Sequence, residues 1–318
     1  MALDHYVSQV HLRKFASSEL GGRLHAIRKS DLKRFSPRTK DVCRIDEGST
    51  NEYLSEPRAI EEFLKTVEGR YNAAVSSLEA GKPDNESIYV IAGFAAYVMS
   101  CSPAAMRINL TPMAGTLEIT ARLLDNDQKL PPPPKELGGK NLTELLESGK
   151  VKFEVDPKYP QAIGISNILR HVAKFGNFRW DILINDQSDC QFFTSDYPVG
   201  SEPTLDPRVL NRIVPLAPNL AVRFRPDINL PRNITSFEFR NFSFDQQKVT
   251  RQQAIEINRL LVRTAEETLF FRDNQPWVAG FVEKNRHFRI DTENTQIPHP
   301  DGGILLWSRQ QVAAFRRR

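Results

Sequence analysis

The chain has 318 residues, a formal net charge of +4 and a sequence pI near 8.9. Its 40% hydrophobic and 26% charged residues are typical of a globular protein and exclude a largely disordered chain. Cys43, Cys101 and Cys190 are widely spaced and form no CxxC pair, which argues against a disulfide framework or a thiolate zinc site. We therefore expect a cytoplasmic protein. The longest apolar run, Ile88–Cys101, is too short to cross a bilayer, so no membrane partner is expected.

The N-terminal half is predicted to be helical. A short arm, His5–Phe15, carries Tyr6, Val10 and Leu12 and is expected to dock on the body of the protein, because a free arm would leave these side chains in water. Apolar residues at helical spacing then predict one helix from Pro57 to Gly81. Further helices are expected at Ile88–Cys101, from Pro103 or Thr111 to Leu123, at Leu142–Leu146 and at Gln161–Phe175. Four prolines at 131–134 predict an exposed connector.

The second half is rich in predicted strands. Alternating apolar and β-branched residues indicate two strands joined by a polar turn, Trp180–Ile184 and Cys190–Thr194, followed by Asp196 and Pro198. Thr250 is a suitable N-cap for a helix that reaches Leu269. More strands are predicted at Arg212–Pro215, Leu220–Phe224, Ser236–Phe244, Trp277–Val282, Phe288–Ile290 and Ile304–Trp307.

These elements predict an α+β fold in which an N-terminal helical half packs on a small, mainly antiparallel sheet closed by a C-terminal helix. We expect one domain over residues 1–272, with a helical part at 1–176 and a strand-rich part at 177–272. Residues 273–318 would form an extension of short strands with a basic tail, Arg316–Arg318.

Several motifs resemble the bacterial domain-of-unknown-function family 4238 over roughly residues 4–272. The most specific are His5-Tyr6-Val7-Ser8-Gln9, with Leu12-Arg13 and Phe15, and Phe193-Thr194-Ser195-Asp196 with Pro198. Ile60-Glu61, Val67-Glu68, Val214-Pro215-Leu216 with Pro218, and Ile257-Asn258 extend the similarity. Such sequences usually show an arginine two residues before the proline at 103, where this chain has Cys101. The resemblance implies a fold more than a reaction.

The N-terminal arm also carries candidate chemistry. His5, Gln9 and Arg13 recur every four residues and would share one face of a helix. Together they suit a phosphate or carboxylate, with His5 as a general acid or base and Gln9 and Arg13 as substrate-binding groups. The same polar groups could instead fasten the arm to the fold. His11 points elsewhere on that helix and is predicted to be a surface residue.

Three carboxylates are candidate metal ligands. Glu61 and Glu68 lie seven residues apart on one helical face, and Asp196 follows the central strand. One glutamate with Asp196 and His5 would suit Mg²⁺ or Mn²⁺, and Asp196 is also a candidate catalytic residue. The alternatives are salt bridges from the glutamates to Arg58, Lys65 or Arg70, and an aspartate that bonds to its own turn. His171 is expected to pack within its helix.

The predicted function is a hydrolase acting on nucleic acid or another phosphodiester, such as a metal-dependent nuclease in a toxin-like or phage-defence effector. The basic stretch Arg23–Arg44 and the arginine tail could contact phosphates of a nucleic-acid partner. Aromatic residues are sparse there, and charged runs are commonly solvated surfaces. The competing hypothesis is a non-catalytic sensor or interaction module that binds a ligand or a partner protein in the same polar groove.

Overall fold

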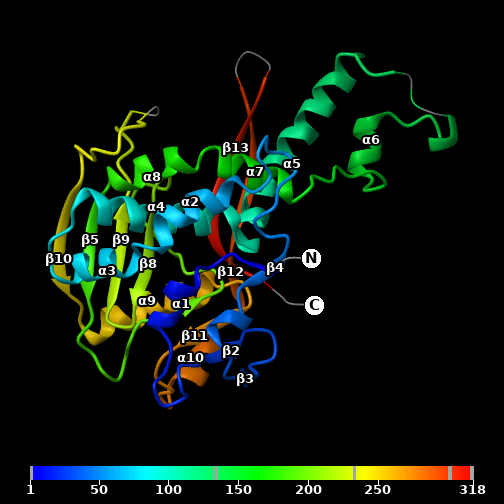
Figure 1. The fold of residues 1–318 in the computed structure, drawn as a ribbon. Helices are drawn as coiled ribbons and strands as arrows, with labels where there is room; N and C mark the ends of the chain where they lie inside the picture. Colours follow the sequence, from blue (N-terminus) through cyan, green and yellow to red (C-terminus); the bar gives the residue numbers. More distant parts are fainter. Residues whose placement is uncertain (1–2, 132, 134, 232–233, 300–302, 316–318) are drawn as a thin grey trace.

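The computed structural model describes residues 3–315, except 132, 134, 232–233 and 300–302. The chain forms a mixed α+β structure, which confirms the predicted class. Helices of the N-terminal half lie beside a five-stranded sheet, and a smaller sheet lies in the lower part of Figure 1.

The larger sheet has the strand order β10-β5-β9-β8-β7. Its members are β5 (Arg179–Ile184), β7 (Gly200–Pro203), β8 (Leu210–Ala217), β9 (Leu220–Arg225) and β10 (Ser243–Lys248). All neighbours are antiparallel except β10 and β5. The strands predicted at Trp180–Ile184, Arg212–Pro215 and Leu220–Phe224 are confirmed.

Both faces of this sheet carry apolar side chains. Ile182 and Phe224 belong to the main core cluster, which includes the helix α4 (Asn85–Cys101). Leu183 lies on the opposite face, in a cluster with residues of α9 (Arg251–Thr264). Burial on both faces explains the three consecutive apolar residues Ile182, Leu183 and Ile184 in β5.

The helical half contains α1 (Gln9–Lys14), α2 (Ala59–Glu68), α3 (Tyr71–Glu79), α4, α5 (Pro103–Asn126), α6 (Leu142–Glu147), α7 (Lys158–Ser166) and α8 (Ile168–Gly176). The single helix predicted from Pro57 to Gly81 is wrong, because the chain breaks at Gly69 and Arg70 between α2 and α3. Both residues keep helix-like backbone angles, so the apolar spacing continues across the break. The predicted helix Gln161–Phe175 divides in the same way, at Asn167.

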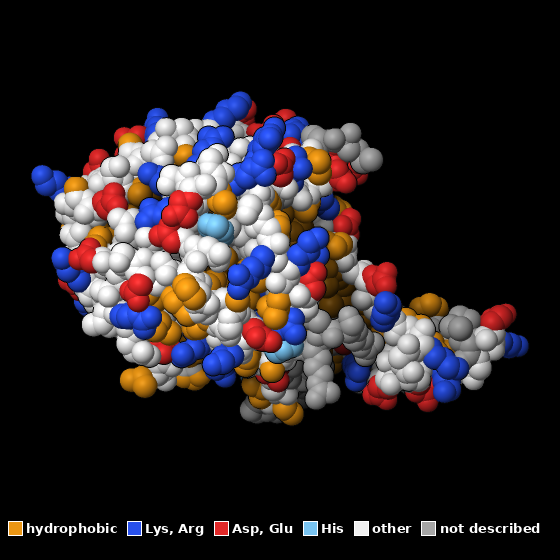
Figure 2. Space-filling view, turned by 90° about the horizontal axis from the view of Figure 1, so that it is seen from below, with side chains coloured by type: hydrophobic (Ala, Val, Ile, Leu, Met, Phe, Trp, Pro, Cys, Tyr) orange, Lys and Arg blue, Asp and Glu red, His pale blue; other side chains and the backbone are white. Residues whose placement is uncertain are grey.

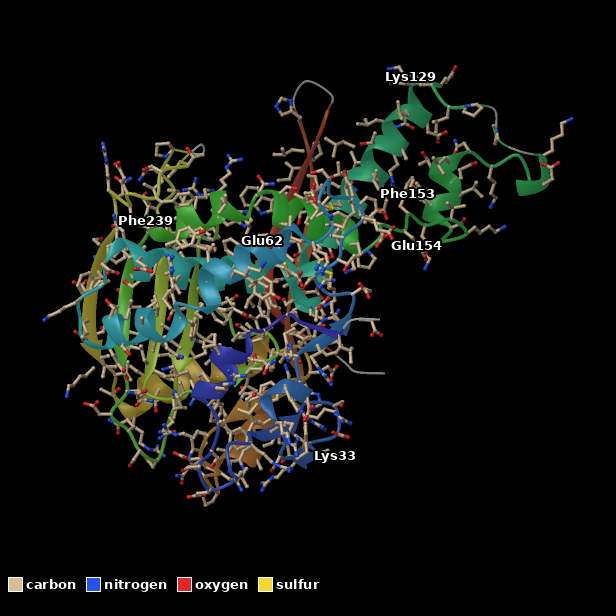
Figure 3. All side chains as sticks on the ribbon, viewed as in Figure 1. Lys33, Glu62, Lys129, Phe153, Glu154 and Phe239 are labelled. Atoms are coloured by element: carbon tan, nitrogen blue, oxygen red, sulfur yellow. The ribbon has the colours of Figure 1, made fainter. Side chains whose placement is uncertain are left out.

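Helix α5 begins at the earlier of its two predicted starts. The Ser102 side chain accepts a hydrogen bond from the Ala105 N–H at 3.2 Å, and Pro103 takes the first helical position. The outer half of α5 projects from the body together with α6, and Figure 3 shows Lys129 at the outer end of this projection. The predicted proline connector lies partly outside the described residues.

A second sheet has the order β3-β2-β11-β6. It contains β2 (His25–Arg28), β3 (Arg34–Phe35), β6 (Thr194–Ser195) and β11 (Thr268–Phe271). The strand predicted over Cys190–Thr194 is therefore wrong, since only the short β6 forms, and it joins this second sheet. The Phe192 N–H bonds to the Pro218 carbonyl and the Phe193 N–H to the Asn258 side chain, so neither needs a strand partner.

The predicted strand Ser236–Phe244 is also wrong in most of its length. Phe239 adopts a left-handed backbone conformation, with φ of 47°, which is incompatible with a strand. Its ring is buried against Gly176 at the end of α8, where there is no Cβ to exclude it. Figure 3 shows Phe239 at this position, and strand β10 begins only at Ser243.

The C-terminal part differs from its prediction in two ways. Helix α9 starts after the predicted N-cap Thr250 but ends at Thr264, and Leu269 lies in β11. Residues predicted as the strand Trp277–Val282 form a helix instead, α10 (Val278–Asn285). The strands predicted at Phe288–Ile290 and Ile304–Trp307 belong to a long antiparallel ribbon, β12 (Phe288–Pro298) and β13 (Ile304–Ala314).

In the described ranges no single helix is both long and apolar enough to cross a membrane, although α4 and α5, which meet at 62°, reach that length and apolarity when taken together.

Candidate functional site

The N-terminal motif forms a strand and a helix that dock on the body. Strand β1 (Leu3–His5) pairs with β4 (Arg44–Asp46), and α1 follows it. Val7, Leu12 and Phe15 are fully buried, and the Tyr97 hydroxyl donates to the His5 carbonyl. The prediction of an ordered, docked arm is confirmed.

His11 is the residue through which the N-terminal and central motifs meet. Its Nδ1 lies 2.8 Å from the Tyr71 hydroxyl and its Nε2 lies 2.8 Å from the Thr194 Oγ1. The ring stacks on Phe94 with the centroids 4.6 Å apart and is completely buried. Burial lowers the pKa of His11 to about 3, so the ring is neutral at ordinary pH. The prediction of a surface histidine is wrong, because α1 is packed against the protein on this side.

Asp196 is a buried anchor for the connection between α9 and β11. Its two carboxylate oxygens accept hydrogen bonds from the backbone N–H groups of Glu266, Glu267 and Thr268 at 2.9, 2.7 and 2.9 Å. Burial raises the pKa of Asp196 to about 6, although the backbone donors and the Lys29 ammonium act in the opposite direction. The alternative of an aspartate that bonds to its own turn is also wrong, because all three donors belong to a segment about 70 residues further along the chain.

A hollow of about 380 Å³ brings together several of the predicted site residues. We call it the acidic hollow, and its lining residues are Leu3, Asp4, His5, Gln9, Ser49, Glu61, Leu64, Lys65 and Glu68. It lies where β1 and α1 meet α2. Asp196 does not line it, so the structure gathers His5, Gln9, Glu61 and Glu68 but not the central carboxylate.

His5 is held in a neutral state at this hollow. Among the described residues its Nε2 has no hydrogen-bond partner and is covered by protein atoms. Burial, followed by the Arg44 guanidinium, lowers the pKa of His5, while the Lys40 backbone and the Glu68 carboxylate act to raise it. A neutral imidazole has one unprotonated ring nitrogen, which can accept a proton.

The two glutamates each have a partner already. Arg58 holds Glu61 through two guanidinium nitrogens, one of them Nε at 3.0 Å, and lowers the pKa of that carboxyl. The Ser8 hydroxyl donates to Glu68. In the part of the chain that the structure describes, no group of three His, Cys, Asp or Glu side chains could hold a metal ion. The carboxylates predicted as metal ligands, Glu61, Glu68 and Asp196, therefore do not form one cluster.

A second hollow of about 380 Å³ adjoins the first and shares Gln9 with it. We call it the basic hollow, and its lining residues are Gln9, Arg13, Gly21, Gly22, Arg23, Arg38, Thr39 and Lys40. Arg13 donates to the Gln9 side-chain oxygen at 3.1 Å. Gly21 and Gly22 have φ of 60° and 82°, conformations that a side chain would strain, so the turn that carries Arg23 needs both glycines. The lining contains four cationic side chains and no carboxylate.

The position of the unusual Cys101 is structural. Its thiol is buried at the end of α4, where burial raises its pKa to about 12, and the Gln161 side chain and Lys158 lie near it. A thiol with so high a pKa is not a nucleophile at neutral pH.

The prediction that His5, Gln9 and Arg13 share one helical face is wrong for His5, which ends strand β1, whereas Gln9 and Arg13 both lie on α1. Gln9 lines one hollow with His5 and the other with Arg13. Other features of the site have no local signal. Arg38, Thr39 and Lys40 reach the basic hollow through the turn η1 (Thr39–Asp41), and the basic composition of residues 23–44 was the only indication of their role. His11 carries no mark in the sequence that distinguishes a buried histidine from an exposed one.

The fold and its motifs define an α+β protein in which the N-terminal helix α1 is joined to a central Thr-Ser-Asp motif by a buried hydrogen bond between His11 and Thr194. The family model described as "Protein of unknown function (DUF4238)" matches residues 4–275. The chain belongs to this family. No curated protein and no solved structure matches it.

Proposed function

We propose that this protein binds a phosphodiester, such as the backbone of nucleic acid, at the basic hollow and hydrolyses it at the adjoining acidic hollow. One observation carries the proposal: the two hollows share Gln9, so a neutral histidine lies beside a lining of four cations. Phosphate recognition and proton transfer are the two requirements of phosphodiester hydrolysis, and they meet at this point.

The cations of the basic hollow would hold the phosphate. Arg13, Arg23, Arg38 and Lys40 can donate charge-assisted hydrogen bonds to phosphate oxygens, and guanidinium groups match their geometry. Gln9 lies between this lining and His5, where its amide can orient the scissile group.

His5 would then act as the proton carrier. Its neutral imidazole removes a proton from the attacking water, whose oxygen forms a new bond to phosphorus. The bond from phosphorus to the leaving oxygen breaks, and the imidazolium returns the proton to that oxygen. The lowered pKa of His5 keeps the ring in the unprotonated form that the first of these steps requires.

A divalent ion, Mg²⁺ or Mn²⁺, fits the described residues poorly. Arg58 donates hydrogen bonds to Glu61, and the Ser8 hydroxyl donates one to Glu68. Asp196 accepts hydrogen bonds from backbone N–H groups outside both hollows. The proposed hydrolysis therefore uses no metal ion. A cleavage assay with and without added divalent ions tests this directly.

The test is a cleavage assay on labelled single-stranded and double-stranded RNA and DNA. The His5→Asn variant should lose at least 100-fold of the cleavage rate, the usual contribution of a general acid or base, while its melting temperature stays close to that of the wild type. His287→Asn is the matched control, since His287 is exposed and lies outside both hollows. Full activity in His5→Asn would refute the assignment.

A non-catalytic binding module is the second candidate. Its support is that Glu61 and Asp196, two of the acidic groups considered for catalysis, already make structural contacts. Binding of an oligonucleotide that is weakened by Arg38→Gln, together with no turnover under any metal condition, would identify the chain as such a module. A toxin-like or phage-defence role is tested by expression in cells: the wild type should arrest growth and His5→Asn should not.

A further inference from the structure

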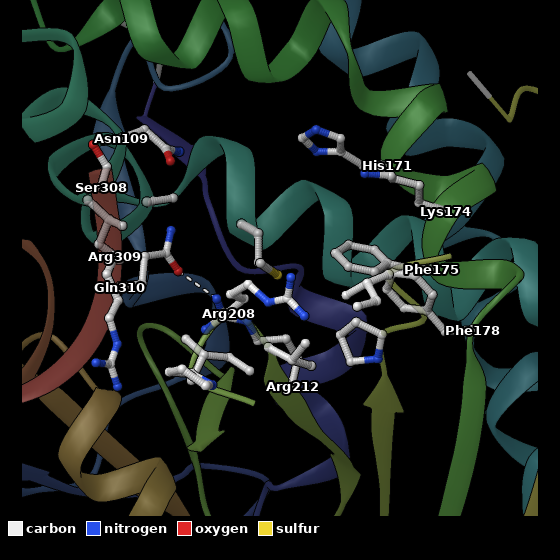
Figure 4. A pocket seen from close by; sticks show the side chains of 18 of the residues that line it. Asn109, His171, Lys174, Phe175, Phe178, Arg208, Arg212, Ser308, Arg309 and Gln310 are labelled. Atoms are coloured by element: carbon white, nitrogen blue, oxygen red, sulfur yellow. Dashed lines mark hydrogen bonds between the residues drawn. The ribbon is translucent and has the colours of Figure 1, made fainter. Parts of the chain in front are cut away.

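A separate cavity of about 550 Å³ lies on another side of the molecule. Its walls come from α4 and α5, from α8 and the residues after it, from the β7–β8 region, and from the middle of β13 (Figure 4). This volume lies within the range of natural small-molecule sites. None of its lining residues belongs to the acidic or basic hollow.

The ionisable lining of this cavity is one-sided. His171 and Lys174 come from α8, Arg208 from the loop before β8, Arg212 from β8, and Arg309 from β13. The lining has no Asp or Glu, although the chain as a whole carries 43 Lys and Arg against 39 Asp and Glu. Charges of one sign in a concave site concentrate the local potential and attract anions.

Arg212 is the most informative of these residues. Its guanidinium donates to the Ser201 hydroxyl and to the Gln310 side-chain oxygen, and the latter bond is drawn in Figure 4. No carboxylate lies within ion-pair distance of it among the described residues. Burial accordingly lowers its pKa. A cation in such surroundings is costly to desolvate unless an anion joins it.

Neighbouring arginines of the same sheet show the contrast. Arg223 on β9 pairs with Asp181 at 3.1 Å and with Glu202 at 2.9 Å. Arg225, also on β9, pairs with Asp181 at 2.6 Å. The sheet therefore supplies carboxylates to Arg223 and Arg225 and leaves Arg212, which faces the cavity, with neutral partners.

Much of the remaining lining of this cavity is apolar and aromatic. Phe175 and Phe178 pack edge to face with centroids 5.7 Å apart, and Trp307 lies in the opposite part of the lining. The hydroxyl of Tyr197, whose pKa is raised by burial, stays protonated and available as a donor. A flat ring would find aromatic surface here, and a charged group would find the cations.

We propose that this cavity binds an organic phosphate with a flat aromatic body, of which a nucleoside monophosphate is the natural example. Cations from three parts of the lining suit the double charge of a phosphate better than the single charge of a carboxylate, and one guanidinium can donate two hydrogen bonds to phosphate oxygens. This site is additional to the proposed hydrolytic site and does not depend on it.

Isothermal titration with adenosine monophosphate, adenosine and inorganic phosphate tests the inference. The monophosphate should bind at least tenfold more tightly than either adenosine or phosphate alone, because only it engages both the cations and the aromatic wall. Adenosine binding as tightly as the monophosphate would overturn the role of the cations. Phosphate binding as tightly would overturn the aromatic body, and the absence of binding by all three probes at millimolar concentration would overturn the site.

Substitutions locate the ligand. Arg212→Gln and Arg208→Gln should each weaken binding of the monophosphate tenfold or more, the usual loss when a hydrogen bond to a charged group is removed. Arg240→Gln is the matched control, because Arg208 and Arg240 each form an exposed pair with a nearby acid but only Arg208 lines the cavity. Arg208→Gln keeps the test decisive if Arg212→Gln fails to fold. Binding that is weakened by Arg38→Gln and unaffected by Arg208→Gln would place the ligand at the basic hollow and refute the inference.

Discussion

The buried histidine on α1 should make the stability of the protein depend on pH. His11 is neutral in the folded state, with a pKa of about 3 against 6.5 for the free side chain. Below pH 6.5 the unfolded chain therefore binds a proton at His11 that the folded chain does not. Linkage requires the free energy of unfolding to fall as the pH falls through this window, which extends from 6.5 down to 3.

The size of the effect follows from these two values. Between pH 8 and pH 5 the unfolded state gains about 2 kcal/mol from protonation of His11, whereas the folded state gains almost nothing. At pH 5 this free-energy difference is set by the pKa of 6.5 in the unfolded chain. It is therefore the same for any pKa of His11 in the folded state that lies well below 5. A loss of 2 kcal/mol is a large share of the stability of a typical domain.

Urea unfolding of the wild type and of His11→Gln at pH 8, 6.5 and 5 measures this contribution. Glutamine is of similar length and can still bond to Tyr71 or Thr194, but it does not titrate. The other titrating groups are common to both proteins, so the wild type should lose about 2 kcal/mol more than the variant between pH 8 and pH 5. Equal losses in the two proteins would show that His11 becomes protonated in the fold and would refute the reasoning.

Three further changes should act on stability. Asp196→Asn should lower the free energy of unfolding by about 2–4 kcal/mol, because an amide cannot accept all three backbone hydrogen bonds and places N–H groups against donors. Gly176→Ala should cost about 1–3 kcal/mol, since the new methyl group would lie 2.2 Å from the ring of Phe239. Removal of residues 1–15 should lower the melting temperature by several degrees through loss of the buried Leu12 and Phe15.

Each of these changes has a matched measurement. Asp273→Asn changes an exposed aspartate in the same chemical way as Asp196→Asn, and equal stability of the two variants would contradict the anchoring role. Gly280→Ala is the control for the glycine, because nothing lies within 4 Å of its added Cβ. A melting temperature that does not move after removal of the arm would show that its docking contributes nothing.

The sequence was most informative where one physical signal acts alone. The apolar run Ile88–Cys101 located most of α4, and the N-cap Thr250 located the start of α9. It failed where the deciding contact is distant, as at Phe239, whose buried ring and left-handed backbone depend on Gly176. Strand alternation alone could not reveal that the hydrogen bonds of Phe192 and Phe193 are satisfied from β9 and α9.

The candidate site shows the same difference between features with a local signal in the sequence and features that depend on distant contacts. Gln9 and Arg13 are related by helical spacing on α1, whereas His5 lies near Gln9 because strand β1 leads directly into that helix. The placement of Asp196 depends on the end of α9, about 70 residues away along the chain, and nothing near Asp196 indicates it. The excess of cations lining the cavity of about 550 Å³ could not be predicted from the sequence either, because these cations come from three separate parts of the chain.

The hydrogen bonds that hold the ribbon of β12 and β13 against the rest of the protein have a practical consequence. The Lys29 ammonium donates to the Phe288 carbonyl at 2.8 Å, and Arg107 reaches the Ile290 carbonyl at 2.9 Å and Asp291 at 3.2 Å. The family match ends at residue 275, so every one of these acceptors lies beyond it. The end of the family match therefore does not coincide with the end of a folded unit. A protein shortened to the matched residues would expose two buried or half-buried cations and lose the cavity wall formed by β13, and its failure to fold or bind would say nothing about the family's shared chemistry.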